Sequence, residues 1–217
     1  TGIAEYLKEI NLEKNIRILE IGAGTGATTS FVLEKLKSRK TEYVFTDVSQ
    51  LFLSKANERF GEHNFIDYRI LDIEKDPAEQ NFDVNSFDII IASNVIHTTK
   101  DIIQSLSNIK KLLNKNGTLI LTEATEKQKW VDLVFGLLDG WHRYEDKELR
   151  QDYPLISAEK WKEVMEGSGF NEVEIISPEG KNKRSLTSQS VIIGKGVNSS
   201  GSNCLILSDK GNFSKKL

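Results

Sequence analysis

Three glycines at alternate positions, Gly22, Gly24 and Gly26, directly follow an apolar run that ends in Leu19-Glu20-Ile21. Glycine permits a tight turn and lets the backbone approach a ligand without an intervening side chain. A strand before these glycines and a helix after them place the turn at the carboxyl edge of an open α/β sheet, where such sheets bind ligands. The pattern therefore predicts a site for a nucleotide-like ligand. The alternative is an ordinary strand-to-helix turn.

Acidic residues before and after the glycines narrow the choice of ligand. Asp47 lies about 20 residues on, where a carboxylate binds ribose hydroxyls, and this fits NAD as well as S-adenosylmethionine (SAM). The spacing GxGxG rather than GxGxxG favours SAM. Glu20 supplies an anion for the positively charged aminopropyl end of SAM, and Asp72 is placed to accept from the adenine amine. Solvated carboxylates are the alternative for Glu20 and Asp72. An NAD-dependent dehydrogenase is the weaker reading.

His97 and Glu123 form a candidate acid-base pair. Each follows or ends a predicted strand, and those strands are neighbours in the expected sheet, so both side chains reach the same edge. Imidazole, with an unperturbed pKa of about 6.5, is the usual general base near neutrality. A carboxylate that accepts from one ring nitrogen fixes the tautomer and leaves the other nitrogen free to take a proton. This chemistry requires no metal. In the alternative interpretation, His97 caps or hydrogen-bonds a loop, and Glu123 is a solvated carboxylate at the end of a strand.

Apolar runs rich in β-branched residues alternate with amphipathic stretches along the chain, which predicts a parallel sheet covered by helices on both faces. The helix after the glycines is expected to bury Ala27, Phe31, Val32 and Leu36 on one face. A later helix carries Ile102, Leu106, Ile109 and Leu113, and is expected to end at a cap formed by Asn116 and Gly117. Two further helices are expected from Ser49 to Phe60 and from Ser157 to Gly167. The expected strands are Ile16–Ile21, Glu42–Thr46, Phe65–Ile70, Phe87–Ala92, Thr118–Glu123, Asn171–Ser177 and Thr187–Ile193.

The stretch from Trp130 to Tyr153 is helical in pattern and rich in aromatic residues, which suggests a cover over the site. Trp141 and Tyr153 are the aromatic residues expected nearest the cleft, as substrate contacts. Trp130 and Trp161 are expected in the core, because a large aromatic side chain mainly buries area. The acidic cluster Glu145, Asp146 and Glu148 is expected to be a solvated helix face or end.

The composition excludes several classes of protein. The 217 residues are 38% hydrophobic and 28% charged, with a net charge of −3 and scattered Lys and Arg, so we expect no nucleic-acid partner. Cys204 is the only cysteine, which excludes an intrachain disulfide and fits a reducing compartment. No apolar stretch approaches the ~20 residues of a membrane helix. We therefore expect a cytoplasmic protein without a membrane partner.

The motifs together resemble the class I SAM-dependent methyltransferases. They comprise LEIGAGTG at 19–26, Asp47, Asp72-Ile73 and FDIIIASNVIH at 87–97. The resemblance implies an α/β fold with a seven-stranded sheet of order 3-2-1-4-5-7-6, the last strand antiparallel. It also implies SAM as the cofactor. The cofactor-binding positions implied are Glu20, Gly22, Gly24, Gly26, Asp47, Asp72, Ile73 and Asn94.

A narrower resemblance is to the C-methyltransferase domain of modular polyketide synthases. It is carried by Ala92 to Thr98, Thr122-Glu123-Ala124-Thr125, the stretch 135–141 and Leu149 to Ser157. In that family the histidine and glutamate at the positions of His97 and Glu123 are the catalytic pair. The resemblance implies methylation of the α carbon of a β-ketoacyl chain on an acyl carrier protein. It also implies the other domains of the same synthase as partners.

The chain departs from this family in several places. His142 stands where the family often has a second tryptophan, and a longer N-terminal lid region is largely missing. Residues 1–196 are expected to form the methyltransferase domain. Residues 197–217 are expected to be a linker followed by the start of a ketoreductase-like region. An O-methyltransferase and a noncatalytic structural domain remain the alternatives to C-methylation.

Overall fold

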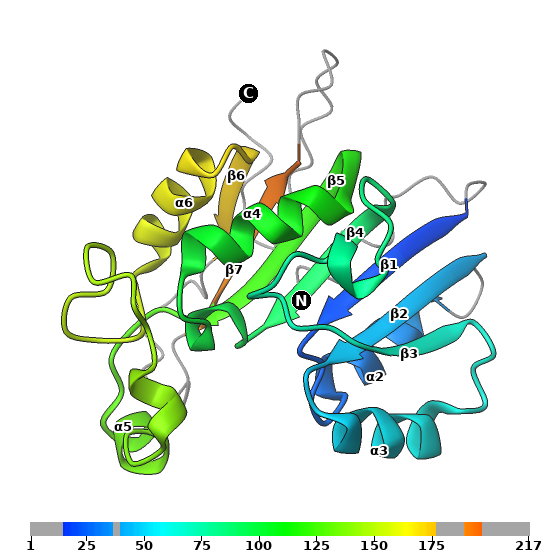
Figure 1. Ribbon diagram of the computed structural model, residues 1–217, viewed down its shortest axis with the longest axis horizontal. Coiled ribbons are helices and arrows are strands. Elements are labelled where there is room, and N and C mark those ends of the chain that lie inside the picture. Colours follow the sequence, from blue (N-terminus) through cyan, green and yellow to red (C-terminus); the bar gives the residue numbers. More distant parts are fainter. Residues whose placement is uncertain (1–14, 37–39, 177–188, 197–217) are drawn as a thin grey trace, which may run out of the picture.

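The computed structural model describes residues 15–36, 40–176 and 189–196. Within them one sheet has the strand order β3-β2-β1-β4-β5-β7-β6 (Figure 1). Strands β1 to β5 pair in parallel, whereas β7 is antiparallel to both β5 and β6. The predicted strand order and the antiparallel last strand are confirmed. The strands are β1 (Ile16–Ile21), β2 (Thr41–Asp47), β3 (Ile66–Ile70), β4 (Phe87–Ser93), β5 (Leu113–Ala124), β6 (Asn171–Ile176) and β7 (Gln189–Lys195).

Helices cover both faces of the sheet, because residues along each central strand alternate between two apolar clusters. On one face Leu19 and Ile90 pack against α4 and α6. On the other face Ile18 and Ile89 pack against α2 and α3. The helices are α2 (Ala27–Leu36), α3 (Gln50–Phe60), α4 (Ile102–Leu112), α5 (Lys129–Phe135) and α6 (Ala158–Gly167), and the short 3₁₀ turns are η1 (Ala78–Gln80), η2 (Ile96–Thr98) and η3 (Asp139–His142).

The buried face of α2 differs from the prediction. Phe31 is 72% exposed, whereas Thr29, Val32, Leu33 and Leu36 are buried. The buried residues recur at the spacing of one helical face, and Phe31 falls outside it. Thr29 turns that face inward, because its hydroxyl donates to the carboxylate of Glu20 in β1. Ala27 is exposed as well, so the prediction that Ala27 and Phe31 lie on the core face is wrong.

Helix α4 ends earlier than predicted. Its last residue is Leu112, and Leu113 already has extended backbone and starts β5. The side chain of Asn114 donates to Asp88 of β4 at 2.6 Å, which holds this stretch against the neighbouring strand. The pairing of β4 with β5 shifts register between Phe87 and Ile89. Gly117 therefore lies in an irregular part of β5, and the predicted cap at Asn116 and Gly117 is wrong.

Several predictions fall outside the described residues. These are the first two residues of the strand predicted to begin at Thr187, the linker 197–203, Cys204 and the ketoreductase-like tail. The domain boundary at 196 therefore stays a prediction.

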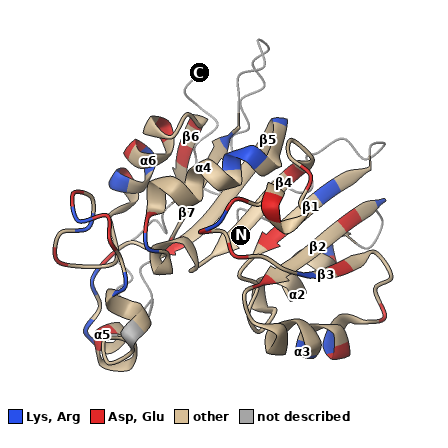
Figure 2. Ribbon diagram, in the orientation of Figure 1, with Lys and Arg blue, Asp and Glu red and all other residues tan. Residues whose placement is uncertain are grey.

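The part of the chain that the structure describes has mixed surface charge and shows neither a membrane-spanning helix nor a metal-binding cluster. Basic and acidic residues are interspersed over its helices and loops rather than gathered by sign (Figure 2). Among the same residues no helix has the length and apolarity required to cross a bilayer. In that part of the chain, no cluster of three or more His, Cys, Asp or Glu side chains is arranged to hold a metal ion.

Candidate active site

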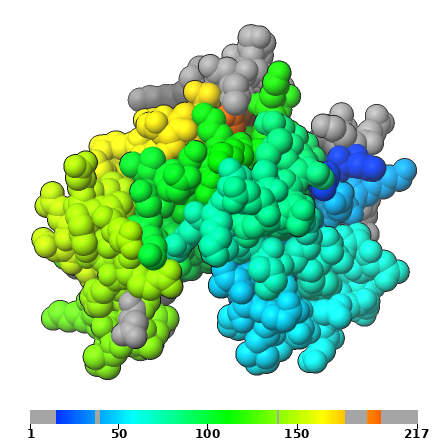
Figure 3. All heavy atoms as spheres, in the orientation of Figure 1, coloured from blue at the N-terminus to red at the C-terminus, as the bar shows by residue number. Residues whose placement is uncertain are grey.

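A cavity of about 740 Å³ lies at the carboxyl ends of the central strands. In the space-filling view a hollow separates the part of the molecule that contains α5 from the part that contains α3 (Figure 3). One wall includes Gly22, Asp47 and Ile73, and the opposite wall includes Trp130 and Trp141. The volume falls within the range of about 300–1,000 Å³ that is typical of small-molecule and cofactor sites. The predicted glycine turn and the predicted cover therefore face one another.

The glycine turn adopts a backbone that side chains would obstruct. Gly22, Gly24 and Gly26 have φ values of 59°, 53° and 74°, in the left-handed region. A Cβ on Gly22 would lie 2.6 Å from a methyl group of Val95, and a Cβ on Gly26 would lie 2.6 Å from the ring of Phe60. The backbone conformation favours glycine at all three positions, and close packing also requires it at Gly22 and Gly26.

Asp47 fastens the glycine turn to β2. One carboxylate oxygen accepts from the amide of Gly24 at 3.0 Å, and the other accepts from the amide of Ser49 at 2.8 Å. The side chain also lines the cavity. The predicted ribose-binding carboxylate therefore lies at the cavity wall, with its position set by backbone donors.

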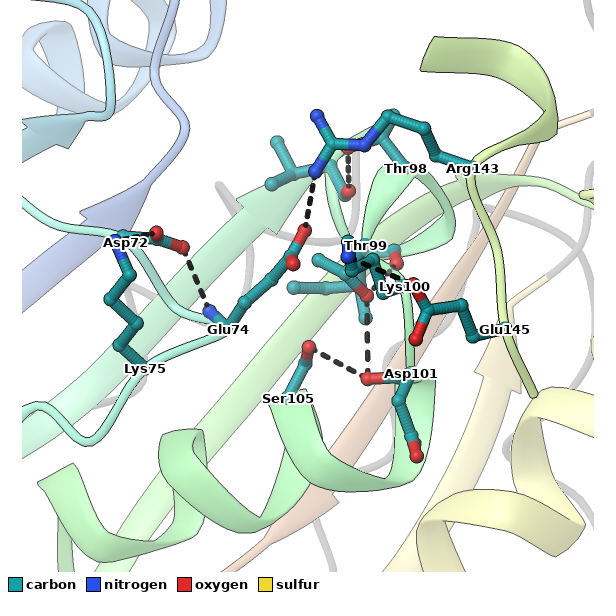
Figure 4. Close-up of polar contacts among 12 residues, drawn as sticks. Asp72, Glu74, Lys75, Thr98, Thr99, Lys100, Asp101, Ser105, Arg143 and Glu145 are labelled. Atoms are coloured by element: carbon teal, nitrogen blue, oxygen red, sulfur yellow. Dashed lines mark hydrogen bonds and ion pairs between the residues drawn. The ribbon is translucent and has the colours of Figure 1, made fainter.

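Asp72, Ile73 and Asn94 continue the same wall. The carboxylate of Asp72 accepts from the amide of Glu74 and pairs with Lys75 at 2.9 Å (Figure 4). Ile73 is buried and adds an apolar surface. Asn94 has a φ of 54°, and its amide donates to the carbonyl of Thr122 in β5.

Glu20 is buried behind the glycine turn and is not among the residues that line the cavity. Its carboxylate accepts from the hydroxyls of Thr29 and Tyr43, at 2.5 and 2.6 Å. Burial raises the pKa of Glu20 to about 7, and these two hydrogen bonds partly offset that rise. In the structure Glu20 joins β1, α2 and β2 beneath the turn instead of facing the cavity.

His97 and Glu123 meet at the edge of the cavity. The Nδ1 atom of His97 lies 2.6 Å from Oε2 of Glu123. The other carboxylate oxygen accepts from the amides of Ile96 at 2.9 Å and Val95 at 3.3 Å. Glu123 is fully buried, and His97 is 9% exposed and lines the cavity. The predicted pair therefore lies in contact, with the imidazole as the member that faces the open space.

Aromatic residues of the predicted cover pack over this pair. The ring of Trp141 lies edge-on to His97 at 6.0 Å and stacks on Phe135 at 5.8 Å. Trp141 lines the cavity, whereas Tyr153 packs edge-on against Trp141 from behind. The hydroxyl of Tyr153 donates to Asp132 at 2.6 Å, and burial together with this carboxylate raises the pKa of Tyr153 to about 12.

Two predictions about this region are wrong. Trp130 is 42% exposed and lines the cavity instead of the core, whereas Trp161 is fully buried as predicted. The side chain of Asp146 is only 7% exposed, because it pairs with Arg150 and accepts from the amide of Ile102. Asp146 is therefore a buried partner rather than part of a solvated face.

Further residues of the site lacked a distinguishing sequence pattern. Val48, Leu155 and Arg143 line the cavity, and the guanidinium of Arg143 lies 3.5 Å from the carboxylate of Glu74 (Figure 4). This contact joins the aromatic cover to the side of the cavity that contains Asp72 and Ile73. Arg150 is fully buried and donates to the carbonyl of His97 at 2.7 Å. In the sequence, only the high aromatic content of the stretch from Trp130 to Tyr153 indicated that it covers the site.

Comparison with known proteins assigns the family. A family model described as "Methyltransferase domain" matches residues 19–119, which carry the glycine turn and His97. A solved structure of the CurJ carbon methyltransferase superposes with a TM-score of 0.84 and 45% sequence identity, over 90% of this chain and 52% of that one. The chain belongs to the SAM-dependent methyltransferases. It is homologous to the carbon methyltransferase domains of polyketide synthases.

Other relatives agree with this assignment of the methyltransferase. The non-reducing polyketide synthase ausA of Penicillium brasilianum is 44% identical over 179 residues, which are 79% of this chain and 7% of that protein. The trans-methyltransferase CalH, solved in complex with SAH, superposes with a TM-score of 0.80 at 34% identity, over 89% of this chain and 54% of that one. The methyltransferase thus spans about half of these two solved chains and 7% of the synthase.

The residues of the methyltransferase fit its cofactor, SAM. Gly22 lines the cavity and has no room for a side chain beside Val95, so its backbone forms this part of the wall, as a ligand of nucleotide type requires. Asp47, Asp72 and Ile73 line the cavity, where the two carboxylates would accept from the ribose hydroxyls and the adenine amine and Ile73 would offer an apolar surface to the adenine ring. Bound there, SAM would supply an electrophilic methyl group, and His97 lines the same cavity.

Proposed function

We propose that this methyltransferase transfers a methyl group from SAM to the α carbon of a β-ketoacyl thioester carried by an acyl carrier protein. His97 is the general base, and Glu123 orients it. The observation that carries the proposal is the 2.6 Å contact between these side chains at the cavity edge. Solved carbon methyltransferases and polyketide synthases among the relatives support the choice of a carbon acceptor and of a synthase as the setting.

The hydrogen bonds of Glu123 support the role assigned to His97. Oε1 of Glu123 already accepts from two backbone amides, so Oε2 is the oxygen left to accept from the imidazole. Donation from Nδ1–H to Oε2 leaves Nε2 with a free lone pair. The buried carboxylate also stabilises the imidazolium that forms when Nε2 takes a proton.

The acceptor carbon suits this base. A carbon between a ketone and a thioester loses a proton readily, since the resulting charge spreads over both carbonyl oxygens. His97 would remove that proton, the α carbon would bond to the methyl group that SAM supplies, and the bond between this methyl group and the sulfonium sulfur would break, with its electron pair going to sulfur. General-base catalysis of this kind contributes about 10²- to 10⁴-fold to the rate. No metal enters the step.

The aromatic cover supports an acyl substrate. Trp130, Phe135 and Trp141 line the wall opposite the cofactor-binding residues, together with Leu138 and Leu155. An apolar wall of this kind shields the acceptor carbon from water and packs against an alkyl chain. Trp141 contacts His97 directly, so the substrate chain would lie beside the base.

The experiment that tests the proposal combines the chain with SAM and a β-ketoacyl thioester, first on an acyl carrier protein and then on a small thiol. Mass spectrometry measures the added methyl group, and NMR assigns the atom that carries it. We expect a branched methyl group at the α carbon. A methoxy product would instead indicate an O-methyltransferase, and SAM binding without any transfer would indicate a structural domain.

Variants of the pair sharpen this test. His97→Ala should lower turnover by roughly 10²- to 10⁴-fold while SAM still binds with wild-type affinity in calorimetry. His63→Ala is the matched control, because His63 lies outside the cavity lining and its ring packs on Phe65. Equal activity in the two variants would contradict the role of His97.

A further inference from the structure

Arg150 is a fully buried cation behind the catalytic pair. Its side chain is 0% exposed, and arginine is almost never fully buried unless its charge is paired. Nε donates to Oδ1 of Asp146 at 2.6 Å, and Nη1 donates to the backbone carbonyl of His97 at 2.7 Å. The guanidinium charge is thus paired with Asp146, and one of its N–H groups donates directly to the backbone of His97.

The remaining donors of Arg150 go to the same segment. Nη2 donates to the carbonyl of Thr99 at 2.7 Å and to that of Lys100 at 3.0 Å. One planar guanidinium therefore joins three backbone carbonyls between η2 and α4. A lysine offers a single point of charge and does not reproduce this fork of donors.

Asp146 fixes Arg150 and the end of that segment together. While Oδ1 accepts from Arg150, Oδ2 accepts from the amide of Ile102, the first residue of α4, at 3.1 Å. The amide of Glu145 also donates to the carbonyl of Lys100, and the side chains of these two residues pair at 2.8 Å (Figure 4). The segment from 97 to 102 is thus held to residues 145–150 along its length.

We propose that Arg150 is a positioning residue that holds His97 in place for proton abstraction. The proposal rests on the proposed function of His97 as the base. Glu123 fixes the imidazole ring, and Arg150 fixes the backbone that carries it. Misplacement of a catalytic group by about 1 Å costs roughly a hundredfold in rate. Arg150 acts through His97, because it is not among the residues that line the cavity.

Kinetics of two substitutions tests this role. Arg150→Met should lower kcat roughly a hundredfold, with the dissociation constant of SAM unchanged, because the cofactor wall does not contact Arg150. Arg150→Lys should recover part of kcat, since its ammonium keeps the charge beside Asp146 and donates to fewer carbonyls. Met165→Ala is the control for lost stability, because Met165 is buried between α6 and the sheet. This substitution should lower the melting temperature and leave kcat unchanged.

A second readout needs no substrate. The chain holds only three histidines, so ¹⁵N NMR resolves the His97 ring. The wild type should show one tautomer with the proton on Nδ1, and the Arg150 variants should show a mixture. If Arg150→Met fails to fold, Arg150→Lys carries both measurements.

Folded variants with wild-type kcat and wild-type His97 resonances would overturn the proposal. A wild-type chain that transfers no methyl group to carbon would instead refute the proposed function. In that case the NMR measurement still decides whether Arg150 positions His97.

Discussion

Glutamine in place of Glu20 should make the methyltransferase more stable at alkaline pH. Burial raises the pKa of Glu20 from 4.5 to about 7, so the folded chain holds this proton more tightly than the unfolded chain does. The stability that Glu20 contributes is therefore full below pH 4.5 and is lost as the pH rises through about 7. At 1.36 kcal/mol for each pH unit, this rise in pKa from 4.5 to about 7 makes the loss of folding free energy about 3 kcal/mol.

Urea unfolding at a series of pH values measures this effect. Glu20→Gln resembles the protonated acid, so its free energy of unfolding should exceed that of the wild type by up to about 3 kcal/mol at pH 8 and by little near pH 5. Glu42→Gln is the control, because Glu42 lies on the neighbouring strand in an exposed pair with Arg17, and such pairs contribute ~0–1 kcal/mol. Parallel curves for Glu20→Gln and the wild type between pH 5 and 8 would refute the reasoning.

Further predictions concern the site. Glu123→Gln should lower kcat roughly a hundredfold, because its side chain no longer offers a charged acceptor to His97, and should leave SAM affinity unchanged. Stopped assays measure kcat, and calorimetry measures SAM affinity. Gly22→Ala should weaken SAM binding and cost about 1–3 kcal/mol of stability, since its φ is positive and its Cβ meets Val95; an unchanged melting temperature would contradict this. Tyr153→Phe should cost about 1 kcal/mol in urea unfolding through its lost bond to Asp132, with kcat kept.

The sequence predicts the sheet and several residues that line one side of the cavity, because the determinants of both are local. An apolar strand followed by alternating glycines has few alternatives, and the structure places Gly22, Asp47, Ile73 and Asn94 along one cavity. His97 and Glu123 could be paired in advance because adjacent parallel strands end at the same edge of a sheet.

Other features depend on contacts that no local pattern encodes. Phe31 is apolar at a plausible helical spacing, yet the hydroxyl of Thr29 turns a different face of α2 inward. Glu20 is a carboxylate at the strand end, yet two hydroxyl donors hold it behind the glycine turn. Arg150 binds the backbone carbonyls of residues 97, 99 and 100, and carbonyls are present at every residue, so the sequence does not show that Arg150 reaches His97.

The same reason explains the error at the end of α4. Asn116 and Gly117 are typical of a helix C-terminus, and local preference alone places the cap there. Tertiary pairing overrides it, because Leu113 lies opposite Phe87 and Asn114 bonds to Asp88. At this end of α4, pairing with β4 rather than local cap preference sets the boundary.

The position of the transferred methyl group tests the central claim most directly. SAM labelled with ¹³C in its methyl group is incubated with a β-ketoacyl thioester and either the wild type or His97→Ala, and the product is analysed by NMR. We predict a labelled methyl bonded to the α carbon with the wild type, and almost no label in the product with the variant. Label on oxygen, or equal transfer to carbon by both proteins, would contradict carbon methylation with His97 as the base.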